Sequence, residues 1–226
     1  MEARKENLLN LIIEDYIKTA EPVGSKFLVR NYRLEFSDAT IRNEMRELEE
    51  EGFLTHPHPS AGRIPTEQGY KYYVEHLPKA ANIGKKTRDE INDIIAAEND
   101  SVAARKNVAK FISDYLNTSV IVAYDDNNVY YTGIANLFSQ PEFSETALTV
   151  NMSAMLDQCE EVIEKVFELV LGNESVALIG RDNPLGGFGS IIGVRVGDDG
   201  LFIILGPMRM DYAKSKNILE YLVKII

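Results

Sequence analysis

The sequence predicts an α+β protein in which an N-terminal winged helix-turn-helix domain precedes a second, mixed α/β domain. Two observations support this fold class. Three short helical patterns, a Pro- and Gly-rich hairpin and a fourth helical pattern follow one another within residues 1–78. Beyond residue 100, β patterns alternate with helical patterns, and about five strands with flanking helices form a typical α+β domain.

The first two helices are predicted from one apolar stripe and one set of end signals. The stripe consists of Leu8, Leu9, Ile12, Ile13, Tyr16 and Ile17. It stops at residues 21–24, where proline and glycine both oppose a helix. Ser25 is a suitable N-cap for a second helix over residues 25–31. We expect Phe27 and Leu28 to face inward from that helix.

The third helix and the wing follow at once. Ser37 is expected to cap a helix that reaches about Glu51, and Gly52 ends it. Short strands at 53–55 and 63–64 flank a turn rich in Pro, Ser and Gly, and Thr66 can cap a fourth helix. This order of elements is that of a winged helix-turn-helix.

The predicted domains are a winged helix over 1–78, a linker and connecting helix over 79–100, and the second domain over 101–226. In the second domain, the β patterns fall at 119–124, 129–135, 175–180, 190–196 and 201–205, with tight turns at 125–128 and 198–200. A single helical stripe is expected over 155–171, and Asp211 can cap the closing helix.

Composition excludes several classes of protein. The lone Cys159 excludes a disulfide scaffold or zinc ribbon and fits a reducing compartment. No uncharged apolar run reaches the roughly 18 residues of a membrane span, and the N-terminus does not resemble a signal peptide. We therefore expect a cytoplasmic protein that has no membrane partner.

The net charge of −11 gives no sign of a nucleic-acid partner. Residues 1–79 carry 11 Lys and Arg against 14 Asp and Glu, a net −3, and residues 80–226 carry 13 against 21, a net −8. Any DNA-binding hypothesis must therefore rest on local geometry.

The third predicted helix has such a geometry. At about 100° per residue, Ile41, Met45 and Leu48 share one face. The opposite face and its flanks present Ala39, Thr40, Arg42, Asn43 and Arg46. Asn pairs with adenine and Arg with guanine in the major groove, while Ala and Thr methyl groups contact thymine. The alternative is that this face is simply exposed to solvent. However, the third helix directly precedes a wing, and this position favours base recognition.

Two neighbouring segments are expected to contact DNA phosphates. Ser25 and Lys26 open the second helix, where backbone N–H groups favour an anion, although Ser25 could serve as a simple cap. In the turn, His56 and three further residues could reach a phosphate or the minor groove. The predicted DNA-contacting residues are Ser25, Lys26, Ala39, Thr40, Arg42, Asn43, Arg46, His58, Ser60 and Arg63.

Catalytic and metal chemistry is not predicted. A metal site at His56 and His58 lacks further ligands, since the only other histidine is His76. The glycine-rich residues 185–189 lack the context and the lysine of a phosphate-binding loop. We expect a protein that is not an enzyme and uses no cofactor. The segment 206–212 forms either a domain or dimer contact, or a local turn in which Asp211 caps a helix and Arg209 pairs with an acid.

Four blocks of sequence resemble the HrcA family of heat-inducible transcription repressors. They are GSKFLVRNY, SDATIRNEMRELEEEGFLTHPHPSAGRIPTEQGYKYYVEHL, GIANLFSQPEF and GPMRMDYAK. The resemblance implies a winged helix followed by a GAF-like domain that carries an inserted dimerising domain. It also implies a homodimer that represses chaperone operons from the inverted-repeat operator called CIRCE, is released on heat stress, and has the GroE chaperonin as partner.

This chain departs from the family pattern in one place. Only residues 125–132 separate the first hairpin strand from GIANLFSQPEF, where the family carries a long insertion. A short form without the inserted domain is therefore predicted. Two other functions stay open: a ligand-responsive regulator, in which residues 185–189 and Arg181 of the GAF-like domain line a small-molecule pocket, and a scaffold that uses the winged helix for protein contacts.

Overall fold

The computed structural model describes residues 1–77, 83–125, 128–144, 146–157, 159–184, 186–187, 189–197 and 200–226. The chain forms two compact units, Met1–Leu77 and Pro78–Ile226. No helix in the described part of the chain has both the length and the apolar character that a membrane span requires.

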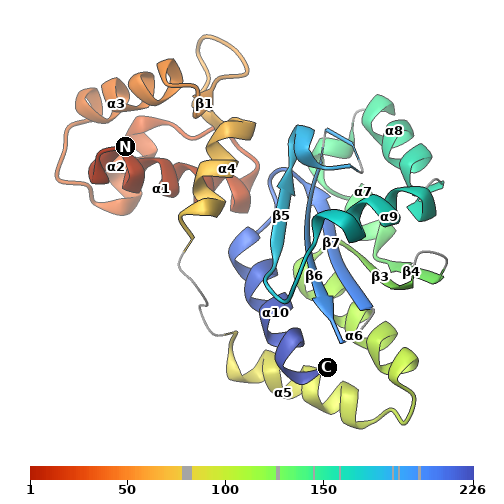
Figure 1. Cartoon of the computed structure of the whole chain (residues 1–226). Coiled ribbons are helices and arrows are strands. Elements are labelled where there is room, and N and C mark those ends of the chain that lie inside the picture. Colours follow the sequence, from red (N-terminus) through yellow and green to blue (C-terminus); the bar gives the residue numbers. More distant parts are fainter. Residues whose placement is uncertain are drawn as a thin grey trace. The chain divides into compact units, whose positions relative to one another are not determined.

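The first unit is a winged helix-turn-helix, as the sequence predicts (Figure 1). Its elements are α1 (Ala3–Thr19), α2 (Ser25–Tyr32), α3 (Asp38–Glu50), β1 (Leu54–Thr55), β2 (Ile64–Pro65) and α4 (Glu67–Glu75). Strands β1 and β2 pair antiparallel, and a further bridge joins Val23 to Arg63. The loop between the two strands, residues 56–63, is the wing.

Local signals explain where these helices begin. The Ser37 side chain accepts a hydrogen bond from the Thr40 amide, and Thr66 accepts one from the Gly69 amide, so both predicted caps are confirmed. Gly52 follows α3 with a φ of 85°, a conformation that glycine adopts without strain. The core of the unit includes Leu8, Leu9, Ile12, Ile13, Leu28, Ile41, Met45, Leu48, Tyr70 and Tyr73.

Two predictions about α2 are wrong. Gly24, not Ser25, is the N-cap residue, and the Ser25 hydroxyl instead hydrogen-bonds the Asp38 carboxylate. Phe27 is 39% exposed, whereas Leu28 is fully buried. The reason is geometric, because Ser25 and Leu28 lie three residues apart and share the inward face of an eight-residue helix, which leaves Phe27 outside it.

The second unit contains one five-stranded sheet with helices on both faces. Its helices are α5 (Lys85–Ala96), α6 (Ser101–Leu116), α7 (Ile134–Phe138), η1 (Pro141–Ser144), α8 (Thr146–Asp157), α9 (Cys159–Leu169), η2 (Gly180–Asp182) and α10 (Tyr212–Ile225). Its strands are β3 (Ser119–Asp125), β4 (Asn128–Thr132), β5 (Val176–Ile179), β6 (Gly189–Val196) and β7 (Gly200–Pro207).

The strand order is β4-β3-β7-β6-β5, and every neighbouring pair is antiparallel. The register pairs Val122 with Phe202 and Ile192 with Ile204. This arrangement is the α+β domain that the sequence predicts. β3 and β4 are joined directly, with Asp125 opposite Asn128, at the place where an inserted domain is expected in the family.

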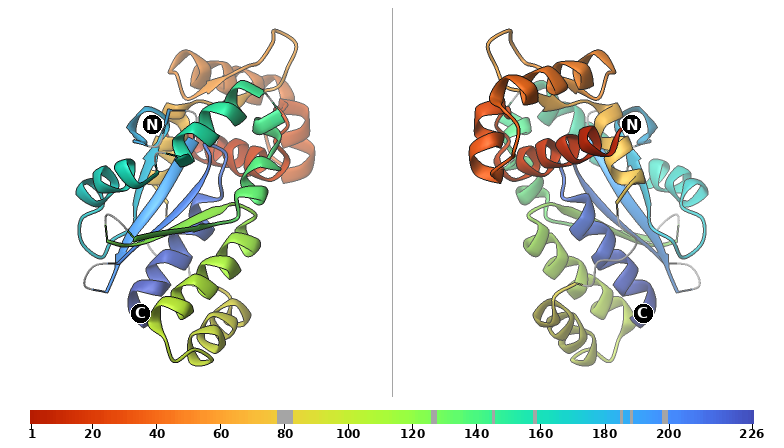
Figure 2. Two further views of the ribbon diagram at one scale, coloured as in Figure 1. Left: turned by 90° about the vertical axis from the view of Figure 1, so that its right-hand side faces the viewer. Right: turned by 90° about the vertical axis from the view of Figure 1, so that its left-hand side faces the viewer.

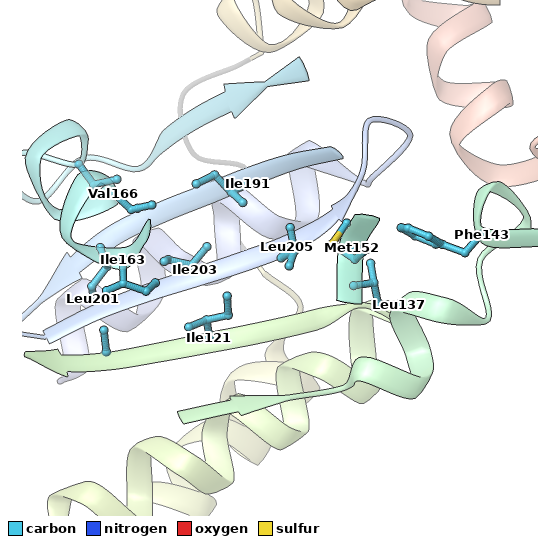
Figure 3. Close-up of a cluster of buried hydrophobic side chains, with 12 residues drawn as sticks. Ile121, Leu137, Phe143, Met152, Ile163, Val166, Ile191, Leu201, Ile203 and Leu205 are labelled. Carbon is cyan, nitrogen blue, oxygen red and sulfur yellow. The ribbon is translucent and has the colours of Figure 1, made fainter. Parts of the chain in front are cut away.

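Side chains alternate between the two faces of the sheet. Ile121, Ile203 and Leu205 point to the face covered by α7, η1, α8 and α9, where they meet side chains such as Ile163 and Val166 (Figure 3). Helices α6 and α10 pack on the other face (Figure 2). Strands β6 and β7 are buried over nearly their whole length, because both faces are covered.

Several predicted boundaries in this unit differ from the structure. The second hairpin strand ends at Thr132, because α7 begins at Ile134. The range 155–171, expected as a single helix, contains all of α9 and only the end of α8, and the rest of α8 is not predicted by the sequence. The side chain of Cys159, the linker at 79–84 and the turns at 125–128 and 198–200 lie wholly or partly outside the described residues.

Helix α5 packs on α6, and the Tyr221 hydroxyl donates a hydrogen bond to the Asn92 side chain at 2.9 Å. These contacts place α5 in the second compact unit. The division of the chain into segments 1–78, 79–100 and 101–226 stays a prediction.

Candidate nucleic-acid interface

Helix α3 has one buried face and one polar face, in the register that the sequence predicts. Ile41, Met45 and Leu48 are at most 4% exposed. On the opposite face, Ala39, Arg42, Asn43 and Arg46 are exposed, and Thr40 is half-buried. The predicted base-reading residues therefore share one continuous surface along the helix.

The two arginines of this face have carboxylate partners one helical turn away. Arg42 contacts Asp38 at 3.0 Å, and Arg46 contacts Glu50 at 3.6 Å. Exposed i,i+4 pairs of this kind contribute only about 0.3–0.5 kcal/mol, so DNA can replace the carboxylate at little cost. Within residues 1–77, no hydrogen bond to the Asn43 side chain is found, and its amide is available to a base edge.

A groove of about 450 Å³ lies beside this face. Three elements meet there: the start of α2, the middle of α3 and the wing. Five of the ten predicted DNA-contacting residues line it, namely Ser25, Lys26, Arg42, Ser60 and Arg63. Cationic side chains next to the N-terminus of a helix suit a phosphate group, because both the charges and the unpaired backbone N–H groups attract an anion.

The two residues at the start of α2 differ in how accessible they are. Ser25 is 8% exposed, and its hydroxyl is already bonded to Asp38. Lys26 is exposed and has no ion-pair partner among the described residues. Of these two side chains, Lys26 is therefore the one that is available to an anion, and Ser25 connects α2 to α3.

The predicted DNA-contacting residues of the wing differ in exposure. His58 and Ser60 are exposed, and the His58 ring contacts the Ser60 hydroxyl at 3.2 Å. Arg63 is half-buried, and its guanidinium lies 2.7 Å from the Glu49 carboxylate, which also contacts His56. No cluster of three metal-ligating side chains occurs in the part of the chain that the structure describes.

Sequence reasoning missed two acidic residues of this interface, Asp38 and Glu49. The spacing of Asp38 and Arg42 is a readable signal, since residues four apart on a helix are neighbours. No comparable signal exists for Glu49, because its partners in the wing are 7 and 14 residues away and meet it only after the hairpin has folded.

Features of the second unit that could have been functional have structural roles. Arg209 contacts Glu142 at 2.5 Å, and the Asp211 side chain accepts a hydrogen bond from the Lys214 amide. The local-turn interpretation of residues 206–212 is confirmed. Arg181 is exposed, while Leu185 and Phe188 lie outside the described residues.

The second unit also has a pocket of about 260 Å³, lined by Asn173, Glu174, Ser175, Lys216, Glu220, Val223 and Lys224. Small-molecule sites typically measure about 300–1,000 Å³ and are mostly apolar. This charged depression is therefore a poor candidate for the ligand pocket of a ligand-responsive regulator.

Comparison with known families shows to which family this chain belongs. The family model described as the HrcA protein C-terminal domain matches residues 80–215, more than half of the chain. The chain belongs to the HrcA family. An HrcA relative from Acetivibrio thermocellus, named heat-inducible transcription repressor, is 46% identical over 113 residues, which are 50% of this chain and 31% of the relative.

Local matches of this kind span less than half of the HrcA relatives' own length: 31%, 49% and 26% for the first three. The heat-inducible transcription repressor HrcA of Desulforudis audaxviator aligns at 28% identity over 333 residues, covering 99% of this chain and 96% of the relative. Because this chain has 226 residues, the relative contains segments that have no counterpart here.

A solved structure also resembles this HrcA-family chain along nearly its whole length. It is a crystal structure of a hypothetical protein at 2.2 Å resolution, with a TM-score of 0.76 and 15% sequence identity. The match covers 99% of this chain and 97% of that chain. At this level of identity, the likeness concerns the fold alone.

Proposed function

We propose that this chain is a DNA-binding transcriptional repressor of heat-shock chaperone operons. It binds an inverted-repeat operator of the CIRCE type as a homodimer and is released on heat stress. The observation that supports this function best is the groove between α2, α3 and the wing, which adjoins an exposed helix face bearing Asn43 and Arg46.

The two parts of the interface have separate tasks. Lys26 binds a backbone phosphate in the groove, which fixes the position of α3 on the duplex. Asn43, Arg42 and Arg46 then read base edges in the major groove, and Ala39 and Thr40 contact thymine methyl groups. Contacts to phosphates carry no sequence information, so specificity resides in the α3 face.

A dimer accounts for the inverted repeat. Two copies of α3 enter major grooves about 34–36 Å apart, or a multiple of that distance. One winged helix makes few contacts, and symmetry doubles them. With a net −8 on residues 80–226, attraction to non-specific DNA is weak, so the second copy contributes much of the operator affinity.

We further propose that the repressor leaves the operator on heat stress and that a GroE-type chaperonin is its partner. A marginally stable repressor unfolds on warming and leaves the operator, and the chaperonin returns it to the binding-competent state. The names of the relatives, heat-inducible transcription repressors, support the link to heat.

The test is a gel shift of the purified chain on inverted repeats from the chaperone promoters of its own genome. Shuffled duplexes of equal length serve as the control, salt is varied, and the mass of the complex is measured. We expect nanomolar binding to the repeat with two chains per duplex. Equal affinity for shuffled DNA, or no binding at low salt, would contradict the proposal and favour a scaffold that contacts proteins.

A further inference from the structure

Glu49 lies in the last turn of α3 and contacts both ends of the wing. Its Oε2 is 2.7 Å from Nη2 of Arg63, the last residue of the wing. Its Oε1 contacts Nδ1 of His56, the first residue of the wing. One carboxylate of α3 therefore contacts both the first and the last residue of the wing, the loop that also carries His58 and Ser60.

This cluster is more buried than the other ion pairs of the interface. The exposed fractions of the Glu49, Arg63 and His56 side chains are 22%, 21% and 35%. For Arg42 and Arg46 the fractions are 65% and 63%. Water competes less well for the partners of a half-buried ion pair. The Glu49 contacts therefore break less readily than the exposed pairs that Arg42 and Arg46 form on the surface of α3.

The backbone of Arg63 is fixed as well. Its amide donates to the Val23 carbonyl oxygen at 2.8 Å, and its carbonyl oxygen accepts from the Val23 amide at 2.9 Å. The guanidinium thus extends from a fixed strand position to Glu49, and its charge is balanced by that carboxylate. A phosphate would have to displace a half-buried partner in order to bind it.

We propose that Glu49 and Arg63 are positioning residues that determine operator specificity by fixing the wing against α3. Arg63 does not neutralise a phosphate; among the cations that line the groove, Lys26 has that role. This inference rests on the proposed DNA-binding function. With the wing fixed, His58 and Ser60 meet the duplex in one register relative to Asn43. With the wing released, they contact phosphates in many registers.

The experiment compares the full chain with Glu49→Gln, Arg63→Ala, the double variant, and Glu51→Gln as the matched control. Glu51 follows α3 and pairs with Lys5 of α1, so its substitution removes the same charge but leaves the wing untouched. The double variant has the net charge of the wild type. Affinities for an operator duplex and a shuffled duplex are measured across salt, and hydrogen exchange is followed at the amides of residues 56–63.

We expect Glu49→Gln, Arg63→Ala and the double variant each to lower the operator-to-shuffled affinity ratio by about tenfold, as for loss of a charged hydrogen bond. The double variant should equal the single variants, because all three break the contact between Glu49 and Arg63. The salt slope of Arg63→Ala should stay that of the wild type, and wing amides should exchange faster in Glu49→Gln than in Glu51→Gln.

A salt slope that flattens by about one in Arg63→Ala would make Arg63 a direct phosphate ligand and overturn the inference. Equal ratios and equal exchange in Glu49→Gln and Glu51→Gln would also overturn it. If Arg63→Ala fails to fold, Arg63→Gln replaces it with the same expected slope. A wild-type chain that binds no duplex refutes the DNA-binding function, while the exchange measurement still decides whether Glu49 fixes the wing.

Discussion

The hydroxyl of Ser25 donates a hydrogen bond to the carboxylate of Asp38, the first residue of the recognition helix α3. The second carboxylate oxygen contacts Arg42 at 3.0 Å. Asp38 therefore connects the start of α2 to α3 and holds one cation of the groove. It fixes the relative position of the two helices that a helix-turn-helix presents to DNA.

The first prediction concerns Ser25→Ala. The change leaves a partly buried carboxylate oxygen of Asp38 without its donor, which we expect to lower the free energy of unfolding by about 1–3 kcal/mol. Because the hydroxyl is committed to Asp38, the salt slope of DNA binding should not change. Chemical denaturation and salt-dependent binding check the two statements. A slope flatter by about one, with unchanged stability, would instead make Ser25 a phosphate ligand.

Lys26→Ala should have the opposite signature. Lys26 is exposed and lines the groove, so removing it costs little stability. Loss of one phosphate contact should flatten the slope of log K against log salt by about 0.9, equally on operator and shuffled duplexes. Lys110→Ala, an exposed lysine on α6 with the same charge change, is the control. An identical slope in both variants would remove Lys26 from the interface.

Asn43→Ala tests base reading. Asn43 is exposed near the centre of the polar face of α3, and a bidentate contact to adenine accounts for about 1–3 kcal/mol of discrimination. We expect Asn43→Ala to weaken operator binding by that amount and to relax the base preference at one base pair of each half-site. The salt slope should stay unchanged. Binding to a set of operators substituted at single positions measures this. A uniform loss on every sequence would assign Asn43 to the backbone instead.

The parts of this structure that sequence could predict are those set by neighbours along the chain. Caps at Ser37, Thr66 and Asp211 depend on an amide three residues away. The polar face of α3 follows from helical periodicity alone. For the same reason, periodicity places the predicted base-reading residues on one surface without any tertiary information.

Contacts between distant segments could not be predicted in this way. Ser25 has the chemistry of a cap, but its partner is Asp38, 13 residues on. Glu49 and Arg63 meet because the hairpin returns to α3. An apolar stripe cannot show where one helix ends and the next begins, so the helix predicted over 155–171 joins the end of α8 to α9. Each of these outcomes depends on packing that local sequence patterns do not encode.

Gly62→Ala tests whether the wing must lie against the segment before α2. A Cβ at Gly62 would be 2.5 Å from the carbonyl oxygen of Val23, and backbone cannot move aside cheaply. The strand would have to shift and break the paired hydrogen bonds between Val23 and Arg63. We expect a loss of about 2–4 kcal/mol in the stability of the first unit. Gly24→Ala is the control, since a Cβ there meets nothing within 4 Å. Equal thermal midpoints for the two variants would contradict this geometry.

The last prediction concerns the second unit and the pH dependence of its stability. Tyr212 is fully buried, and its hydroxyl lies 2.7 Å from the Met208 carbonyl oxygen and 2.8 Å from the Ser190 hydroxyl. Because a carbonyl can only accept, the phenol donates to Met208. Burial raises the pKa of Tyr212 above its ordinary value of 10.0, since the tyrosinate would be desolvated.

The sign of the effect follows from proton binding. Below pH 10 the phenol is protonated in both states, so Tyr212 adds no pH dependence. As pH rises through 10, the unfolded chain loses this proton while the folded chain keeps it, and the free energy of unfolding falls. Tyr212→Phe should be less stable than wild type at pH 8 by about 1 kcal/mol, for the lost hydrogen bond.

Between pH 10 and 11, the stability of Tyr212→Phe should therefore fall less steeply than that of the wild type, and the two curves should converge. Urea unfolding at closely spaced pH values measures this, and Tyr115→Phe, at a 46% exposed tyrosine on α6, is the control. All other groups that titrate in this range are common to the wild type and Tyr212→Phe, so they cancel in that comparison. Parallel curves for wild type and Tyr212→Phe would mean that Tyr212 ionises alike in both states, and that its burial does not hold the proton.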